Sequence, residues 1–190
     1  EGFENAYTVY DVATLEQIGT VQKLNEAGYG SNPIAFSEGI LTDSHYVKGE
    51  QEEHLYTLYA WDTVSGELLS GCYIGEKMPK DVQLRGETLY VLSAAYSNSY
   101  MDCDSYITAI NKTTGEILWE NKLQGLYPDK LVLPAGDGTD LLCINSGSAR
   151  LMNMQTGEIT FVVTLESSVL SANTYSDGSN FLIILENGGM

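Results

Sequence analysis

One sequence pattern occurs four times in this chain: a hydrophobic strand, an Asp or Asn, a short turn, a glutamate and a second hydrophobic strand. The copies occupy residues 7–18, 59–69, 107–119 and 151–161. Leu15, Gly66, Gly115 and Gly157 hold the same position in the four turns, at intervals of 51, 49 and 42 residues. A four-stranded propeller blade takes about 40 to 50 residues, so the pattern predicts a repeat architecture of that kind.

Apolar and polar residues alternate with a period of two along the chain, and no stretch keeps the helical i, i+3, i+4 spacing over three turns. We therefore expect an all-β protein. Asp62, Asn111 and Asn153 stand at strand ends, where a short polar side chain can accept hydrogen bonds from backbone N–H groups two or three residues on. The following glycine supplies the positive φ that closes the hairpin. Leu15 replaces this glycine in the first copy, which predicts the least regular turn.

Two copies carry a fuller motif, LYAWDTVSGE at residues 58–67 and ITAINKTTGEILW at residues 107–119. At these residues the chain resembles the repeat of the quinoprotein-like (PQQ-like, WD40-like) β-propellers, whose consensus runs Leu-Tyr-Ala-Leu-Asp-x-x-Thr-Gly-Glu-x-x-Trp. The resemblance implies four-stranded antiparallel blades. It leaves the activity open, because that group includes quinone-dependent dehydrogenases, an outer-membrane assembly lipoprotein that binds other proteins, and many surface proteins.

We expect one β-propeller domain over residues 1–190, with about four blades whose strands run A to D from axis to rim. The blade segments are 5–24 (strands C and D), 33–74, 80–123, 129–165, and 169–187 (strands A and B, completing the first blade). Such a chain could close on itself as a four-bladed ring, pair with a second copy as a homodimer that completes an eight-bladed ring, or form part of a larger propeller. Of these arrangements we favour the closed or the dimer-completed propeller.

The charge balance restricts the partners. Nine basic and 26 acidic residues give a net charge of −17, a surface that repels phosphate backbones, so we expect no nucleic-acid partner. A protein or peptide partner, cationic where it meets this surface, fits the charge better. No run of 18 apolar residues occurs, so we expect no membrane span in this chain. The compartment stays open, with an extracytoplasmic or cell-envelope location favoured over the cytoplasm.

Catalytic motifs are not evident. The three cysteines have no metal-like spacing, and their odd number predicts free, mostly buried thiols: Cys72, Cys103 and Cys143. Quinone dehydrogenases of the family that the repeat resembles carry adjacent cysteines over the cofactor, which this chain lacks. His45 and His54 flank one loop without a third zinc ligand. We expect no cofactor, although the carboxylates of residues 101–104 and 137–140 could hold calcium, and we lean toward a protein that is not an enzyme.

The candidate site lies on loops. In a propeller, the B–C loops and the connections between blades gather on one face, and loops on a rigid scaffold commonly carry binding. Here this face combines carboxylates with tyrosines, which offer large apolar area and a polar tip. The candidate binding residues are Tyr46, Glu50, Glu52, Glu53, His54, Tyr96, Tyr100, Asp102, Asp104 and Tyr127.

These residues lead us to expect a non-enzymatic scaffold that binds a protein or peptide with this loop face. Two alternatives remain open. The first is a small-ligand or quinone- and calcium-dependent enzyme that uses a central channel, with Arg85 and Arg150 as the available guanidinium groups. The second is a sensor or spacer domain of a larger cell-envelope protein.

Overall fold

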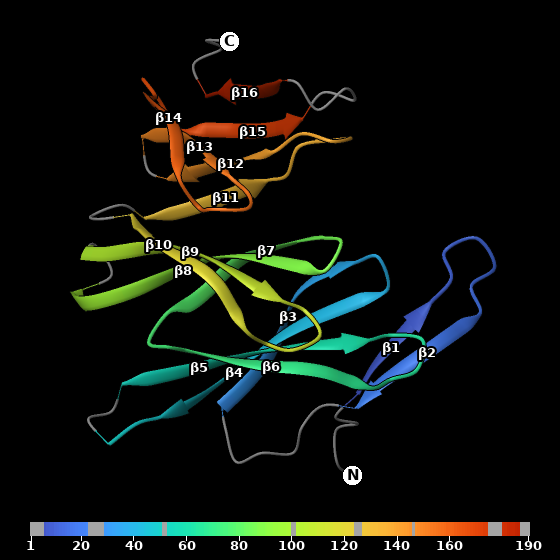
Figure 1. Cartoon of the computed structure of the whole chain (residues 1–190). Helices are drawn as coiled ribbons and strands as arrows, with labels where there is room; N and C mark the ends of the chain where they lie inside the picture. Colours follow the sequence, from blue (N-terminus) through green and yellow to red (C-terminus); the bar gives the residue numbers. More distant parts are fainter. Residues whose placement is uncertain are drawn as a thin grey trace.

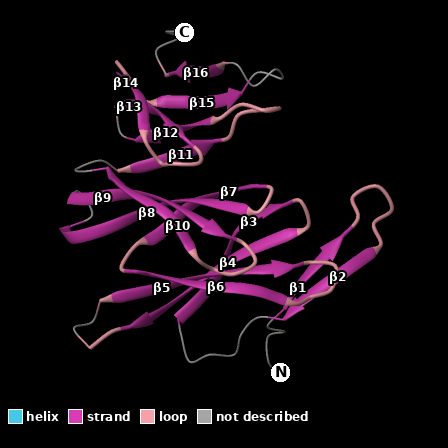
Figure 2. Ribbon diagram, viewed as in Figure 1, coloured by secondary structure: helices cyan, strands magenta, loops and turns pink. Residues whose placement is uncertain are grey.

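The computed structural model describes residues 6–22, 29–50, 53–99, 102–123, 127–145, 147–174 and 180–186. Within these residues the chain forms sixteen strands and no helix (Figure 2). The strands make five antiparallel sheets, three with four strands and two with two strands. The expectation of an all-β protein is therefore confirmed.

The sheets follow the order of the sequence. The N-terminal hairpin comprises β1 (Ala6–Tyr10) and β2 (Gln17–Gln22). The first full sheet comprises β3 (Tyr29–Ser37), β4 (Ile40–Lys48), β5 (His54–Asp62) and β6 (Leu68–Gly75). The second comprises β7 (Met78–Arg85), β8 (Thr88–Ser99), β9 (Asp102–Asn111) and β10 (Ile117–Leu123). The third comprises β11 (Pro128–Val132), β12 (Asp140–Asn145), β13 (Ser148–Asn153) and β14 (Ile159–Thr164). The C-terminal hairpin comprises β15 (Val169–Thr174) and β16 (Phe181–Leu185).

The hydrophobic core lies between successive sheets, so each sheet packs face to face on the next. Leu58 of the first full sheet shares a cluster with Val91 of the second. Ile107 of the second packs in a cluster with Met152 of the third. Burial between sheets explains the period-two pattern, because alternate residues of a strand face opposite neighbours.

The two hairpins lie at opposite ends of this row of sheets (Figure 1). They remain two separate two-stranded sheets and do not pair with each other in the described residues. The single chain therefore shows repeated small sheets without closure into a ring. Completion of one blade from residues 5–24 and 169–187 stays a prediction.

The turns between the last two strands of each full sheet form as the Asx residues predict. Asp62 Oδ1 accepts hydrogen bonds from the backbone N–H groups of Val64 and Ser65, at 2.9 and 2.8 Å. The N–H of Gly66 donates to the carbonyl of Asp62 at 2.9 Å, with φ of 75° at the glycine. The same contacts recur at Asn111 and Asn153 in the next two full sheets.

The turn of the N-terminal hairpin corrects one expectation, because it is as regular as the others. Asp11 Oδ1 accepts the N–H groups of Ala13 and Thr14, both at 2.8 Å, and Leu15 adopts a φ of 59°. The aspartate fixes the turn, and the leucine accepts the left-handed conformation that glycine takes elsewhere. Such a conformation costs a non-glycine residue roughly 1–2 kcal/mol.

The internal turns require glycine for a second reason. A Cβ at Gly66 would lie 2.5 Å from the carbonyl oxygen of Thr20, and one at Gly115 would lie 2.7 Å from that of Gly71. Each turn thus sits directly against the outer strand of the preceding sheet. Among the described residues no sheet precedes the Leu15 turn, and the Leu15 side chain is exposed.

Candidate functional site

The first part of the candidate face is an aromatic cluster at the β4–β5 end. The ring centroids of Tyr46 and His54 lie 4.6 Å apart, and Tyr56 lies 5.6 Å from Tyr46. The register of the hairpin causes this, because Tyr46 pairs with Tyr56 and Lys48 with His54. Sequence reasoning named the first two residues and missed Tyr56, which is buried.

The acidic residues of the same loop are only partly described. Glu50 is exposed, and the carbonyl of Glu53 accepts the N–H of Gly49 at 2.8 Å. Glu52 and Tyr100 lie outside the described residues, as does the side chain of Asp102, whose backbone begins β9.

A lysine brings two of the expected tyrosines together. Lys80 Nζ, on β7, lies 5.2 Å from the ring centroid of Tyr96 and 5.6 Å from that of Tyr127. Burial disfavours the charge of Lys80, but hydrogen bonding and charge interaction with the two tyrosines outweigh burial and raise the pKa of this lysine. These tyrosines therefore already hold a cation supplied by the chain itself.

The expected acid Asp104 is likewise engaged. Its carboxylate forms an ion pair with Lys122 at 2.5 Å, and this hydrogen bond raises the pKa of the lysine. Lys122 Nζ also lies 5.8 Å from the ring centroid of Tyr106, and Lys77 Nζ lies 5.2 Å from the same ring. Lys77 in turn pairs with Glu120 at 2.6 Å. Tyr106 thus lies between two lysine–carboxylate pairs.

A groove with a volume of about 500 Å³ opens beside Tyr106, between the first and second full sheets. We call it the tyrosine groove; its lining includes Leu55, Tyr73, Lys77, Ala95, Tyr106 and Glu120. Tyr73 is 62% exposed. Sequence reasoning missed both tyrosines because they lie within strands, and only the packing of two sheets places them on one groove.

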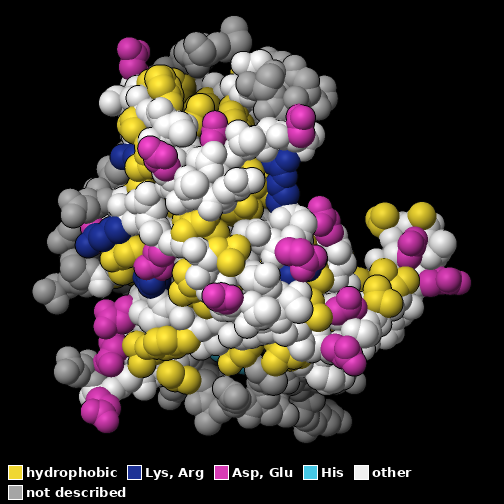
Figure 3. Space-filling view, viewed as in Figure 1, with side chains coloured by type: hydrophobic (Ala, Val, Ile, Leu, Met, Phe, Trp, Pro, Cys, Tyr) yellow, Lys and Arg dark blue, Asp and Glu magenta, His cyan; other side chains and the backbone are white. Residues whose placement is uncertain are grey.

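The charges near this groove are mixed, although the chain as a whole carries a net charge of −17. On the face that Figure 3 shows, acidic and hydrophobic side chains interleave and basic side chains are few. Lys77 in the groove pairs with Glu120, and Lys122 near Tyr106 pairs with Asp104, so the groove itself carries little net charge. Asp104 of the candidate face is one of these paired carboxylates.

The two histidines do not meet. The β4–β5 register pairs His45 with Thr57 and His54 with Lys48. His45 Nε2 lies 3.6 Å from Oδ2 of Asp43, which is completely buried. No group of three potential metal-ligating side chains occurs in the part of the chain that the structure describes.

The cysteines and arginines have structural surroundings. The three cysteines are free and buried, as their odd number predicts, and burial raises the pKa of the Cys143 thiol to about 12. The Arg85 guanidinium donates to the carbonyls of Gly136 and Gly138 in the β11–β12 turn. Arg150 donates to Asn145 Oδ1 at 2.9 Å. Both guanidinium groups are thus committed to the third full sheet.

Within the described residues, no helix is long and apolar enough to cross a membrane.

No family model matches the sequence, and no curated protein matches it. Two computationally designed proteins with solved structures share the fold. The chain is similar to Ika8 with a TM-score of 0.63 and 14% identity, over 97% of this chain and 51% of the Ika8 chain. It is similar to Ika4 with a TM-score of 0.54 and 17% identity, over 88% of this chain and 92% of the Ika4 chain. At these identities the likeness shows the fold alone: an all-β, repeat-like arrangement that spans about half the length of Ika8.

Proposed function

We propose that this protein is a non-enzymatic β-propeller scaffold that binds a protein or peptide through its loop face, with the tyrosine groove as the binding site. The observation that carries the proposal is the arrangement around Tyr106. An aromatic ring lies between two ion pairs, opposite a second tyrosine, in a groove of about 500 Å³. Ligand sites in proteins have volumes of roughly 300–1,000 Å³ and combine apolar lining with a few polar groups.

The groove suits a peptide side chain better than a reaction. Tyr73 and Tyr106 offer aromatic surface, and tyrosine is enriched among the few residues that carry most of the binding energy at recognition sites. The paired charges of Lys77 and Glu120 offer donors and acceptors at its rim. An apolar or aromatic anchor residue of a partner, flanked by polar backbone, would fill this space.

The acidic surface has a separate role in this proposal. The net charge of −17 attracts cationic partners over a distance of about a Debye length, which raises the association rate more than the affinity. The groove tyrosines then determine the affinity. Substitutions of acidic surface residues should consequently change mainly the association rate, whereas substitutions of the groove tyrosines should change the affinity.

Selection of peptides from a random library displayed on phage tests the proposal, with dissociation constants then measured by fluorescence anisotropy. We expect Tyr73→Ser to weaken the selected peptides at least tenfold, because an exposed aromatic anchor is lost without damage to the core. Phe36→Ser is the matched control, since Phe36 is similarly exposed near the β3–β4 turn, at the other end of the strands. Equal binding by both variants, or no enriched peptide, would exclude the groove as the site.

A further inference from the structure

The two hairpins at the ends of the chain are complementary halves of one sheet. In each full sheet the second strand pairs with the third, and the Asx turn joins the third to the fourth. The N-terminal hairpin has the Asx turn and so corresponds to the third and fourth strands. The C-terminal hairpin corresponds to the first and second. Within the described residues, β1 and β16 each have one hydrogen-bonded neighbour and one edge without a strand partner, which we call the free edge.

The residue before the Asx shows what the N-terminal hairpin lacks. In the three full sheets this residue faces the preceding sheet and is 4, 1 and 0% exposed, at Trp61, Ile110 and Met152. In the hairpin the same position holds Tyr10, which is 60% exposed. Within the described residues, no preceding sheet covers this large aromatic residue.

The residue after the Asx is likewise buried or bonded in the full sheets and exposed in the N-terminal hairpin. In each full sheet its backbone N–H donates at 2.9 Å to a carbonyl of the turn between the first two strands: Thr63 to Gly39, Lys112 to Glu87 and Met154 to Thr139. The corresponding residue of the hairpin is Val12, which is 91% exposed. No described residue accepts its N–H. Figure 3 shows hydrophobic side chains at the tip of this hairpin.

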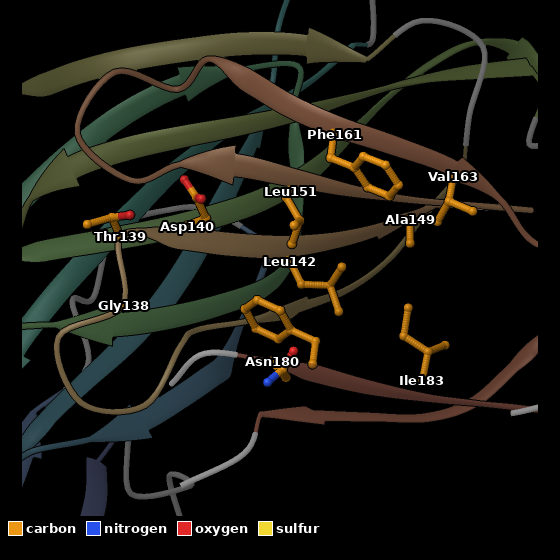
Figure 4. Close-up of a pocket in the computed structure, with 11 residues that line it drawn as sticks. Gly138, Thr139, Asp140, Leu142, Ala149, Leu151, Phe161, Val163, Asn180 and Ile183 are labelled. Atoms are coloured by element: carbon orange, nitrogen blue, oxygen red, sulfur yellow. The ribbon is translucent and has the colours of Figure 1, made fainter. Parts of the chain in front are cut away.

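The opposite end of the chain carries a matching groove. A cavity of about 420 Å³ lies between the third full sheet and the C-terminal hairpin (Figure 4). Leu151, Phe161 and Val163 line it from one side, and Phe181 and Ile183 from the other. Because a two-stranded sheet covers only part of a four-stranded one, Phe161 and Val163 remain exposed. We call this cavity the end groove.

We propose that the end groove receives the N-terminal hairpin of a second copy of this chain, with β1 pairing along the free edge of β16. The N-terminal hairpin of the first copy enters the end groove of the second copy in the same way, and the two contacts close a ring of two copies. Each copy then supplies half of two composite sheets. The comparison with Ika8 agrees with this geometry, because 97% of this chain superposes on 51% of a longer chain.

The full sheets also specify the register. Leu41 pairs with Trp61, Leu89 with Ile110 and Leu141 with Met152, so a fixed residue of the second strand faces the residue before the Asx. Residues 177–182 (DGSNFL) align with residues 137–142 (DGTDLL), which makes Phe181 the counterpart of Leu141. Phe181 therefore pairs with Tyr10 of the second copy, and Leu182 with Val9.

The exposed surface is large enough for a stable pair. Seven apolar residues meet at each junction. A fully buried aromatic side chain removes about 150–250 Å² from solvent, and we take on the order of 100 Å² for each of these residues. The residues are Tyr10, Val12, Leu15, Phe161, Val163, Phe181 and Ile183. Two junctions thus bury roughly 1,400 Å², within the range of about 1,200–2,000 Å² for stable interfaces.

Leu15 distinguishes this junction from the internal ones. The Asx turns of the full sheets require glycine because each turn touches the outer strand of the preceding sheet. A Cβ at Gly157, for example, would lie 2.5 Å from the Trp119 ring. Phe161 holds the same position in β14 as Trp119 in β10. The junction between copies is accordingly wider, and the Leu15 side chain fills the additional space beside Phe161.

A cross-strand disulfide tests both the partner and the register. The double variant Val9→Cys/Leu182→Cys should oxidise to a covalent dimer on a non-reducing gel, because directly opposed residues bring their Cβ atoms within disulfide range. The control Val9→Cys/Ile183→Cys should not, since neighbouring residues of a strand point to opposite faces. The natural cysteines are buried and should stay reduced. A cross-linked monomer, or equal cross-linking by the control, would overturn the proposal.

A second variant keeps the test informative if the cysteine pair unfolds the protein. Tyr10→Ser removes an exposed side chain, so the single chain should fold normally. In sedimentation equilibrium we expect this variant to weaken the pair at least tenfold, whereas Tyr73→Ser, of similar exposure but away from both hairpins, should leave the pair unchanged. An equal effect of the two substitutions, or no effect of Tyr10→Ser, would contradict the assigned interface.

Discussion

Ile110 and Tyr10 hold the same position in two copies of one repeat, yet the first is 1% exposed and the second 60%. The local structure of the two turns is the same, with matching hydrogen bonds to Asn111 and Asp11. The difference arises only from the neighbour: a full sheet packs before Ile110, whereas no described sheet packs before Tyr10. In a repeat protein each unit buries its face against the next one, so an apolar residue at a repeat position stays exposed where no neighbouring sheet packs on it.

The largest effect on stability should come from truncating Ile110, the buried residue of this pair. Ile110→Ala leaves a cavity between the first and second full sheets and should lower the free energy of unfolding by about 2–5 kcal/mol. Tyr10→Ala should change the unfolding of the isolated chain by less than about 0.5 kcal/mol. Urea denaturation at high dilution measures both. Equal losses would mean that the N-terminal hairpin is packed within its own chain.

The turn residues sharpen the comparison at a smaller scale. Gly115→Ala places a Cβ 2.7 Å from the Gly71 carbonyl oxygen at a φ of 73°, and should cost about 2–4 kcal/mol of stability. Leu15→Gly should instead stabilise the isolated chain by about 1 kcal/mol, because it removes left-handed strain. Thermal unfolding of the two variants at low concentration checks the opposite signs. A loss of stability in both would show that Leu15 packs internally.

The same Leu15→Gly change should weaken the pairing of two copies, although it stabilises one. Because the leucine fills the wider junction, we expect a dissociation constant about threefold to tenfold higher, in keeping with the loss of one aliphatic contact. Sedimentation equilibrium measures this constant. Tighter pairing of the glycine variant would indicate a junction as narrow as the internal ones.

The smallest effect concerns pH and distinguishes aspartate turns from asparagine turns. Backbone and side-chain hydrogen bonds to Ser65 hold the pKa of Asp62 below its usual 3.8. A carboxyl whose pKa is lower in the folded chain adds stability above its unfolded pKa, and that stability is lost as the pH falls through the folded pKa. Asp62→Asn should thus reduce the loss of stability between neutral pH and pH values below 3.8. The turn should still form, because Asn111 accepts the same backbone hydrogen bond in the next full sheet. Urea unfolding at the two pH values measures the change, and an unaltered pH dependence would contradict it.

The sequence was sufficient for the features that depend on neighbours in the chain. An Asx followed by glycine fixes a turn within five residues, and alternation fixes which side of a strand is buried. These local rules predicted the strands, and the odd number of cysteines predicted that the thiols are buried and outside disulfides. They failed at Leu15, because the hydrogen bonds of Asp11 outweigh the preference of leucine against a positive φ.

The candidate site depended on residues far apart in sequence and was harder to predict. Lys80 joins Tyr96 to Tyr127, and Lys122 neutralises Asp104, through contacts that no spacing reveals. Tyr73 of β6 shares the tyrosine groove with residues of β8, β9 and β10 only because two sheets pack face to face. The sequence therefore did not predict the tyrosine groove, and the role of the loop face stays a prediction.

The mass of the protein in solution tests the central claim most directly. Sedimentation equilibrium over a wide dilution series should give a species of about twice 20.8 kDa that dissociates on dilution and at low ionic strength, because two copies of charge −17 repel each other when salt is scarce. Tyr10→Ser should shift that dissociation to higher concentration. A mass of 20.8 kDa at every concentration and salt level would contradict the account.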